Sequence, residues 1–281
     1  MNLRDRMRWT LEEDLGPGDL TTEATIPADL TARAQLVAKQ DLVVSGHRFG
    51  AAALHATAER LGVDVSYTPM ADDGDWVARG TTVAEVQGNA RAMLIGERPA
   101  LNLMMRACGI ATHVHTAMAK VGEATFRAVD TRKTTPLWRD LEKDAVRHGG
   151  GHNHRFGLFD GVLIKDNHIA SVGSVAEAVR RARATVHHLI KIEVEVTRID
   201  QIAPAIDAGA DGLLLDNMDD ATLMQAIEQA RTLAPRVFLE ASGNMDAERM
   251  ARIAHFGLDV VSVGGFVHQA RWADLSLRFE P

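Results

Sequence analysis

Cysteine is almost absent from this sequence, with Cys108 the only one among 281 residues. An intrachain disulfide is therefore excluded, which is consistent with a reducing compartment. Aromatic residues are also scarce, at 5%, whereas hydrophobic residues make up 46% of the chain and charged residues 25%. These proportions are ordinary for a globular protein, and they exclude collagen-like, disordered and disulfide-scaffold classes.

Long apolar runs and long basic runs are missing as well. No stretch approaches the roughly 18 consecutive apolar residues that a membrane-spanning helix needs. The first residues, MNLRDRMRWTLEEDLG, carry too many charges for a secretory signal. The net charge is −7, and no basic cluster supplies the face that nucleic acid requires. The sequence therefore predicts a cytoplasmic protein that binds neither membranes nor nucleic acid.

The two halves of the chain have different patterns. Residues 1 to about 108 mix helix and strand signals, with a strand expected at 31–39 and helices at 46–61 and 90–120. The second half repeats a short apolar strand, a polar strand end and a helix. The strands are expected at 125–130, 161–165, 189–196, 212–216, 236–240 and 259–263. Strands that alternate with helices favour a closed or nearly closed parallel α/β barrel, with a doubly wound open sheet as the alternative.

Cations gather where these strands end, which is where parallel barrels carry their chemistry. Arg132 and Lys133 follow one strand, and Lys165 ends the next. Arg155, directly after His154, lies on the loop between them. Arginine pairs with carboxylates and phosphates through two parallel hydrogen bonds, and lysine acts as a point charge. In a chain of net charge −7, this local excess of cations predicts an anionic ligand.

Carboxylates and glycines occupy the remaining strand ends. Glu195 and Asp216 end neighbouring strands, and converging carboxylates suit Mg²⁺ or the hydroxyls of a sugar. The last two strands run into Ser242-Gly243 and Gly264-Gly265, where barrels often hold a phosphate through backbone N–H groups. The residues alone thus indicate a phosphorylated ligand together with a second, acidic ligand.

One further segment has a helical charge pattern. Three basic residues recur at helical spacing and alternate with three acidic ones: Arg139, Lys143, Arg147, Asp140, Glu142 and Asp144. Such a pattern is typical of a solvated or ion-paired surface helix.

At these positions the sequence resembles the quinolinate phosphoribosyltransferase family, also called nicotinate-nucleotide pyrophosphorylase (carboxylating). The strings that carry the resemblance include DTRKTTP at 130–136, NHR at 153–155, KDNH at 165–168 and EASG at 240–243. Matching strings occur in order along nearly the whole chain, beginning with EEDLG at 12–16.

The resemblance implies a domain arrangement and an assembly. An N-terminal α/β sandwich domain is expected over 1–110 and an incomplete α/β barrel over 111–267. A tail, 268–281, returns to the N-terminal domain. The implied assembly is a homodimer with shared active sites, in which the N-terminal domain of one subunit covers the barrel mouth of the other.

The resemblance also implies a reaction and a role for each site residue. Phosphoribosyl is transferred from phosphoribosyl pyrophosphate to quinolinate with decarboxylation, giving nicotinate mononucleotide, CO₂ and pyrophosphate in NAD biosynthesis, with Mg²⁺ as cofactor. Quinolinate is assigned to Arg98 (which reaches the partner's site), Arg132, His154, Arg155 and Lys165. Phosphoribosyl pyrophosphate is assigned to Lys133, Glu195, Asp216, Ser242, Gly243, Gly264 and Gly265. The expected catalytic residues are Lys165, Glu195 and Asp216, of which the two carboxylates are also the candidate Mg²⁺ ligands.

One departure from the family pattern keeps alternatives open. Leu137-Trp138 stands where the family usually has Gly-Leu, close to the substrate loop. A first alternative is therefore a paralogue that transfers phosphoribosyl to another aromatic acid. A second is a ModD-like non-catalytic accessory protein that binds a small anion. A third is a phosphate-binding barrel enzyme such as an aldolase, in which Lys165 would form a Schiff base.

Overall fold

The computed structural model describes residues 2–280, so Met1 and Pro281, at the outer ends of the expected N-terminal domain and tail, lie outside the described residues. The chain divides into two compact units. Unit 1 contains the residues up to His115, the segment Thr134–Gly150 and the residues from Gln269 onward. Unit 2 contains Thr116–Lys133 and Gly151–His268. Thr134–Gly150 thus packs within unit 1, although it lies inside the range 111–267 expected for the barrel.

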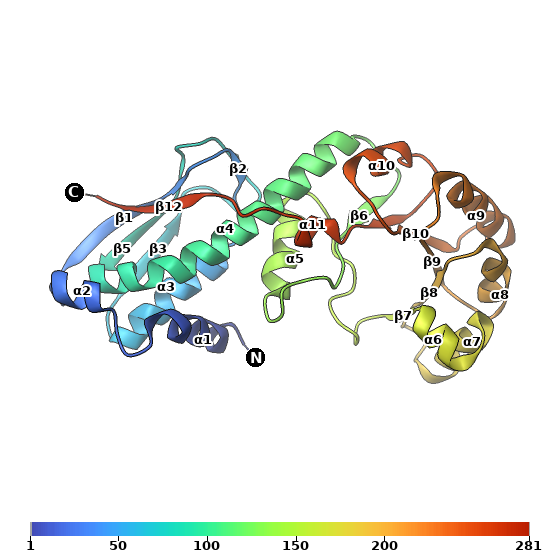
Figure 1. The fold of residues 1–281 in the computed structure, drawn as a ribbon, viewed down its shortest axis with the longest axis horizontal. Coiled ribbons are helices and arrows are strands. Elements are labelled where there is room, and N and C mark those ends of the chain that lie inside the picture. The colour runs from blue at the N-terminus through green and yellow to red at the C-terminus, as the bar shows by residue number, and fades with distance from the viewer. Residues whose placement is uncertain (1, 281) are drawn as a thin grey trace. The chain divides into compact units, whose positions relative to one another are not determined.

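Unit 1 is built on a four-stranded antiparallel sheet (Figure 1). In spatial order its strands are β12 (Leu275–Phe279), β1 (Thr31–Ala38), β5 (Thr82–Asn89) and β3 (Val65–Pro69). The end of the chain therefore returns to this sheet, where Leu277 of β12 pairs with Leu36 of β1. A separate two-stranded pair joins β2 (Leu42–Val43) to β4 (Trp76–Val77).

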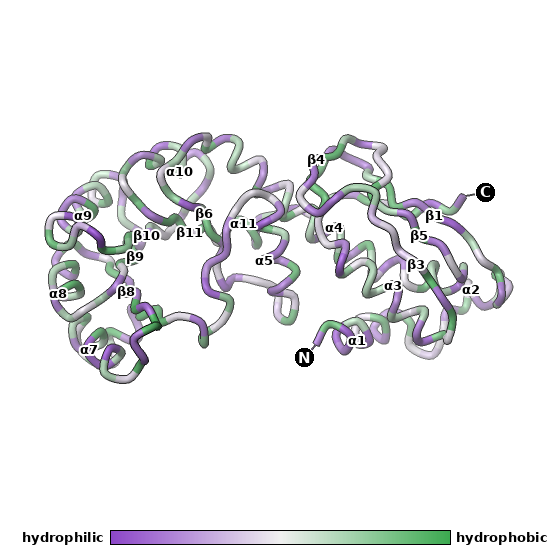
Figure 2. Tube along the Cα trace, turned by 180° about the vertical axis from the view of Figure 1, so that it is seen from behind, coloured by the Kyte–Doolittle hydropathy of each residue, from purple (hydrophilic) through white to green (hydrophobic). Residues whose placement is uncertain are grey.

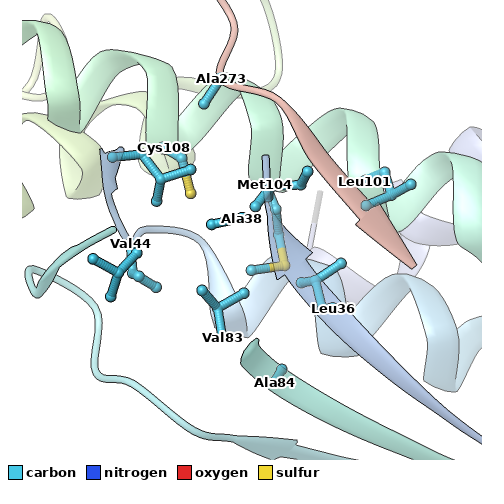
Figure 3. Close-up of a cluster of buried hydrophobic side chains, with 12 residues drawn as sticks. Leu36, Ala38, Val44, Val83, Ala84, Leu101, Met104, Cys108 and Ala273 are labelled. Atoms are coloured by element: carbon cyan, nitrogen blue, oxygen red, sulfur yellow. The ribbon is translucent and has the colours of Figure 1, made fainter. Parts of the chain in front are cut away.

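The helices of unit 1 begin and end at recognisable signals. They are α1 (Leu3–Leu15), α2 (Leu20–Thr25), α3 (His47–Leu61), most of α4 (Ala90–Val121) and α5 (Arg139–His148). The Asn2 side chain caps α1 by accepting from the Asp5 N–H, and Gly16 ends that helix at a φ of 48°. Figure 3 shows the apolar cluster between the sheet and α4, in which Leu36, Met104 and Cys108 are buried. The single cysteine is therefore a core residue.

Unit 2 contains a six-stranded parallel sheet. In spatial order its strands are β6 (Arg127–Val129), β11 (Val260–Ser262), β10 (Phe238–Ser242), β9 (Gly212–Asp216), β8 (Ile192–Val196) and β7 (Val162–Ile164). The order follows the chain around the sheet, but β6 and β7 do not pair with each other. The predicted incomplete parallel barrel is therefore confirmed, with its opening between β6 and β7.

Helices surround the outside of this sheet (Figure 1). They are α6 (Asp166–Val172), α7 (Val175–Thr185), the 3₁₀ turn η1 (Ile199–Gln201), α8 (Ile202–Asp207), α9 (Asp220–Leu233) and α10 (Ala247–Arg252). The short helix α11 (Gly265–His268) follows β11. In Figure 2, α8 and α9 carry both hydrophilic and hydrophobic residues, as helices with one buried face do. Among residues 2–280, none of the helices combines the length and the apolar character that crossing a bilayer demands.

Two sequence-based expectations need correction. The 139–147 helix forms as α5, but it is not a solvated surface helix, because Glu142 is 0% exposed and Lys143 is 3% exposed. Helical spacing does not say what covers a polar face, and here unit 1 covers it. The strand expected at 236–240 is β10 at Phe238–Ser242. Glu240 therefore lies in the middle of that strand and not at its end.

Candidate active site

The parallel sheet aligns several carboxylates on one face. Glu195 of β8 and Glu240 of β10 both pair with Leu214, from opposite sides of β9. Residues aligned in this way project to the same face, as do residues two apart along one strand. The same face therefore also carries Glu193 and Asp216.

Lys165 lies next to one of these carboxylates. It follows β7, and its Nζ is 3.4 Å from Oε2 of Glu195. Burial raises the pKa of Glu195, Lys165 lowers it, and Asp216 raises it again. Glu195 and Asp216 thus repel each other across neighbouring strands. Carboxylate oxygens are the donor type that Mg²⁺ prefers, and Mg²⁺ binding at this pair stays a prediction.

Arg132 and Arg155, two of the three arginines predicted for the acid, influence each other electrostatically. Burial, followed by the nearby charge of Arg132, lowers the pKa of Arg155. The Arg155 guanidinium donates to the Gly161 carbonyl at 2.7 Å, which fixes one side of it. Two guanidinium groups that lie near each other favour an anion close to both.

Asp130, which directly follows β6 and is 0% exposed, holds the loop that carries Arg155. One carboxylate oxygen accepts from the His154 N–H at 2.9 Å and the other from the Asn153 amide at 2.7 Å. The preceding residue, His152, pairs with Val129 of β6 as an isolated parallel bridge. Asp130 is thus a structural anchor of the site, a role that its position at a strand end did not specify.

The His154 ring lies against two of the aligned carboxylates. Its Nε2 is 3.3 Å from Oε2 of Glu240 and 3.7 Å from Oε2 of Glu193. The other ring nitrogen, Nδ1, accepts the Arg155 N–H at 2.7 Å. Sequence reasoning gave neither Glu240 nor Glu193 a role in the site. The available signal was a glutamate inside the apolar string FLEAS.

This cluster retains a proton to high pH. Burial lowers the pKa of His154, but Glu193 and Glu240 outweigh burial and raise that pKa to about 9. A doubly protonated ring cannot accept at Nδ1, so the Arg155 contact favours a ring with hydrogen on Nε2 alone. Burial also raises the pKa of Glu193. The additional proton therefore belongs to His154 and Glu193 together, and the Arg155 contact favours its placement on Glu193.

The two glycine turns lie beside polar groups of the site. Gly243 has a φ of +97°, and a Cβ there would lie 2.2 Å from Oδ1 of Asn217. A Cβ on Gly264 would lie 3.0 Å from Cδ of Lys133. Close packing thus requires glycine at Gly243 and brings the Lys133 side chain across the second turn. Ser242 is the last residue of β10, and Gly265 opens α11.

Arg98 is the one predicted site residue that lies in unit 1. It lines a cavity of about 470 Å³ together with Asn102, Arg106, Trp138 and Trp272. All residues lining this cavity belong to unit 1. The other predicted residues lie in unit 2, at the carboxyl ends of its strands or on the loops that follow them.

Together these features define a class of protein: an open α/β-barrel enzyme with cations, carboxylates and glycine turns at its strand ends. Family comparison makes the assignment specific. The quinolinate phosphoribosyl transferase C-terminal domain matches residues 110–278, and the N-terminal domain of the same family matches residues 19–108. The chain belongs to the quinolinate phosphoribosyl transferase family.

Individual relatives match over nearly their full lengths. A protein of Bacillus subtilis (strain 168) named "Probable nicotinate-nucleotide pyrophosphorylase [carboxylating]" is 39% identical over 277 residues, covering 99% of this chain and 93% of that protein. The "Nicotinate-nucleotide pyrophosphorylase [carboxylating]" of Mycobacterium leprae is 39% identical, covering 98% of this chain and 95% of its own. The crystal structure of NadC from Streptococcus pyogenes has a TM-score of 0.90 at 35% identity, with 99% and 97% of the two chains covered.

Proposed function

We propose that this protein transfers phosphoribosyl from phosphoribosyl pyrophosphate to quinolinate and releases CO₂, giving nicotinate mononucleotide and pyrophosphate. Its family membership supports the reaction class. The observation that carries the proposal is that cations for a diacid and carboxylates for a cationic sugar lie at one edge of the unit 2 sheet. Lys165 and Glu195, 3.4 Å apart, bring the two sets into contact.

Arg132, Arg155 and Lys165 are the proposed binding groups for the two quinolinate carboxylates. Arginine hydrogen bonds to carboxylates are charge-assisted and often bidentate, so they fix the plane of a ring acid. With the acid held in this way, the ring nitrogen can be directed at the anomeric carbon of the sugar. The resemblance also assigns His154 to the acid.

Glu195 and Asp216 are proposed to stabilise the sugar as it reacts. A C–N bond forms between the ring nitrogen and the anomeric carbon, while the bond to pyrophosphate breaks and its electron pair leaves with pyrophosphate. The sugar carries positive charge along the way, and fixed carboxylates near that charge lower the barrier. Mg²⁺, which Glu195 and Asp216 would hold, supplies charge neutralisation for the pyrophosphate group when bound.

Decarboxylation then requires a group that accepts an electron pair, and no separate base is needed. Once the ring nitrogen bears the sugar it is cationic, so it can accept the electron pair that remains when the neighbouring carboxylate leaves as CO₂. The resulting ring carbon takes a proton from solvent. Lys165 is proposed to hold the anionic groups through both steps, and its side chain is 48% exposed and so accessible to a ligand.

The phosphate groups are proposed to bind at the glycine turns. Ser242, Gly243, Gly264 and Gly265 are the proposed phosphate-binding residues, and the space at Gly243 and Gly264 is too tight for a side chain, with Lys133 lying against Gly264. A lysine beside a glycine turn suits a sugar phosphate.

We also propose a homodimer with shared sites and, from the single cysteine, a cytoplasmic location. Arg98 is exposed, and it belongs to unit 1. The family resemblance assigns it to the acid in the partner's site. An Arg98→Ala subunit mixed with a Lys165→Ala subunit tests the sharing. Partial recovery of activity on mixing supports shared sites, and no recovery contradicts them.

The direct test of the function uses purified protein with quinolinate, phosphoribosyl pyrophosphate and Mg²⁺. The expected result is formation of nicotinate mononucleotide and CO₂ in equal amounts, with loss of both when Mg²⁺ is omitted. Pyrophosphate release with other ring acids only would indicate the paralogue. Binding of a sugar phosphate without turnover would indicate a non-catalytic relative, and borohydride trapping at Lys165 would indicate an aldolase.

The position of Trp138 supports the paralogue as a second candidate function. Trp138 lines the same unit 1 cavity as Arg98, so a large ring stands beside a proposed acid-binding residue. If Trp138 selects the acid, Trp138→Leu will change KM for the ring acid and leave KM for phosphoribosyl pyrophosphate unchanged. Comparing quinolinate with pyridine monocarboxylates in this variant separates the two functions.

A further inference from the structure

Both nitrogens of the His154 ring contact other groups of the protein. Nδ1 accepts the Arg155 backbone N–H at 2.7 Å. Nε2 faces Oε2 of Glu240 at 3.3 Å. A nitrogen that accepts from N–H bears no hydrogen, so the ring hydrogen lies on Nε2 and is donated to the carboxylate. The ring therefore has no remaining donor with which to bind a carboxylate of the substrate.

Glu240 is an unusual residue for the middle of a parallel strand. It is 1% exposed, and ionised carboxylates are almost never fully buried unless they are paired. Its Oε1, like Oε1 of Glu193, has no hydrogen-bond partner among residues 2–280. The His154 ring is the polar group that the structure provides for Oε2 of Glu240. A buried carboxylate is unfavourable unless it is paired, so the contact between Glu240 and His154 indicates that Glu240 serves to orient the His154 ring.

The His154 main chain connects this contact to the proposed acid site. Its N–H is fixed by Asp130, and its Nδ1 is fixed by the N–H of the next residue, Arg155. The Arg155 guanidinium is tied to Gly161 at 2.7 Å and lies within the electrostatic influence of Arg132 and Glu193. A rotation of the His154 ring would release the Arg155 backbone, and the guanidinium would move with it.

A metal ion is the competing explanation for the cluster. One nitrogen of His154 and one oxygen each of Glu193 and Glu240 lie within 4.8 Å of one another, close enough to share an ion. Metal binding at Nε2 requires that nitrogen to be unprotonated, which moves the hydrogen to Nδ1. Nδ1 faces an N–H donor, so the hydrogen-bond geometry opposes an ion here.

We propose that Glu240 is a positioning residue: it orients the His154 ring, which holds the Arg155 backbone, so that Arg155 and not His154 contacts the acid. This inference rests on the proposed function for the identity of the acid. It removes His154 from the direct ligands that the family resemblance assigns. It also gives Glu240 a role that sequence analysis did not give it.

The test is a double-mutant cycle between Glu240 and Arg155. Glu240→Met removes the acceptor and keeps a side chain of similar length, whereas Glu240→Gln keeps an acceptor oxygen. We expect Glu240→Met to raise KM for quinolinate by about tenfold, with KM for phosphoribosyl pyrophosphate changed by less than about twofold. Glu240→Gln is expected to recover most of that loss. The exposed Glu228 of α9 supplies a matched control, because Glu228→Met should change neither constant.

The cycle distinguishes positioning from general damage to the fold. In an Arg155→Ala background, Glu240→Met should raise KM for quinolinate by less than about twofold more, because the residue it positions is gone. Multiplicative effects of the two substitutions would overturn the proposal. A parallel rise in KM for phosphoribosyl pyrophosphate, or a Gln variant as impaired as the Met variant, would overturn it as well.

Measurements on the unsubstituted protein keep the proposal testable if Glu240→Met does not fold. The ¹⁵N spectrum of the histidines at pH 7, with His154 identified by its loss in His154→Gln, should show an unprotonated Nδ1 that quinolinate leaves unchanged. A protonated Nδ1, or a shift on adding quinolinate, would contradict the proposal. So would stoichiometric binding of Zn²⁺ that His154→Gln abolishes. Because these readouts need no turnover, they remain informative even if no nicotinate mononucleotide forms.

Discussion

Arg6 and Asp140, 134 residues apart in the sequence, form a bidentate ion pair in unit 1. The guanidinium nitrogens lie 2.6 and 2.5 Å from the two carboxylate oxygens. The same guanidinium donates to the Leu137 carbonyl at 2.5 Å and lies 5.0 Å from the centre of the Trp138 ring. One side chain of α1 therefore holds both residues that depart from the family pattern.

Breaking this pair should destabilise unit 1. Arg6 is 8% exposed, and Arg6→Met would leave the Asp140 carboxylate without its cation and the Leu137 carbonyl without its donor. The expected loss of unfolding free energy is about 3 kcal/mol, which is typical when one partner of a buried pair is removed. Urea denaturation measures it. Arg8→Met is the matched control on the same helix, because Arg8 pairs with Glu59 in an exposed position. Equal shifts in the two variants would contradict the argument.

Replacing Leu137 with glycine should increase the stability of the protein. Its φ is 70°, and its side chain is 65% exposed, so it carries backbone strain and little buried surface. Leu137→Gly is expected to raise the unfolding free energy by about 1 kcal/mol, or to leave it unchanged if unfolded-state entropy offsets the gain. Leu137→Ala keeps the strain and should not stabilise. Thermal unfolding of Leu137→Gly and Leu137→Ala measures this difference. A glycine variant that is less stable than the alanine variant would refute the prediction.

Gly243 should not tolerate a side chain. Alanine there would meet the strain of a φ of +97° and place its Cβ 2.9 Å from the Asn217 backbone nitrogen. We expect Gly243→Ala to cost about 2 kcal/mol or more and to raise KM for phosphoribosyl pyrophosphate. Gly173→Ala is the control, since Gly173 has a φ of +94° with nothing within 4 Å. If both variants show the same stability and the same KM, crowding at Gly243 is unimportant.

The His154 cluster predicts a stability change at alkaline pH. Burial lowers the pKa of His154, but Glu240 and Glu193 outweigh it, and the pKa rises from 6.5 to about 9. The folded protein therefore binds a proton that the unfolded chain has released, and this contribution to stability is complete below about pH 6.5. It is lost as the pH rises through about 9. Unfolding free energies from pH 6 to 10 should fall across this window, with a smaller fall in His154→Gln. Stability that rises with pH there would disprove the linkage.

Much of the fold could be predicted because repetition along the sequence is enough to specify it. The apolar strand GLLLD was expected at 212–216 with a helix after it; the strand forms with those bounds, and α9 follows at Asp220–Leu233. The same repetition predicted a closed or nearly closed barrel, and the family resemblance implied that it is incomplete. Trp138 could be located by sequence but not interpreted, since its contacts with Arg6 and Phe49 come from other segments of the chain.

By itself the sequence determined the succession of strands and helices, the family, and the chemical types at the strand ends, because these depend on local period and residue order. The tertiary structure alone decided that Lys143 is buried in unit 1 and that Thr134–Gly150 belongs there. It also decided that Glu240 faces His154 across the sheet. Burial and pairing are set by residues distant in sequence. A period of 3.6 or 2 tells which residues share a face, whereas the neighbour on that face is known only once the chain has folded.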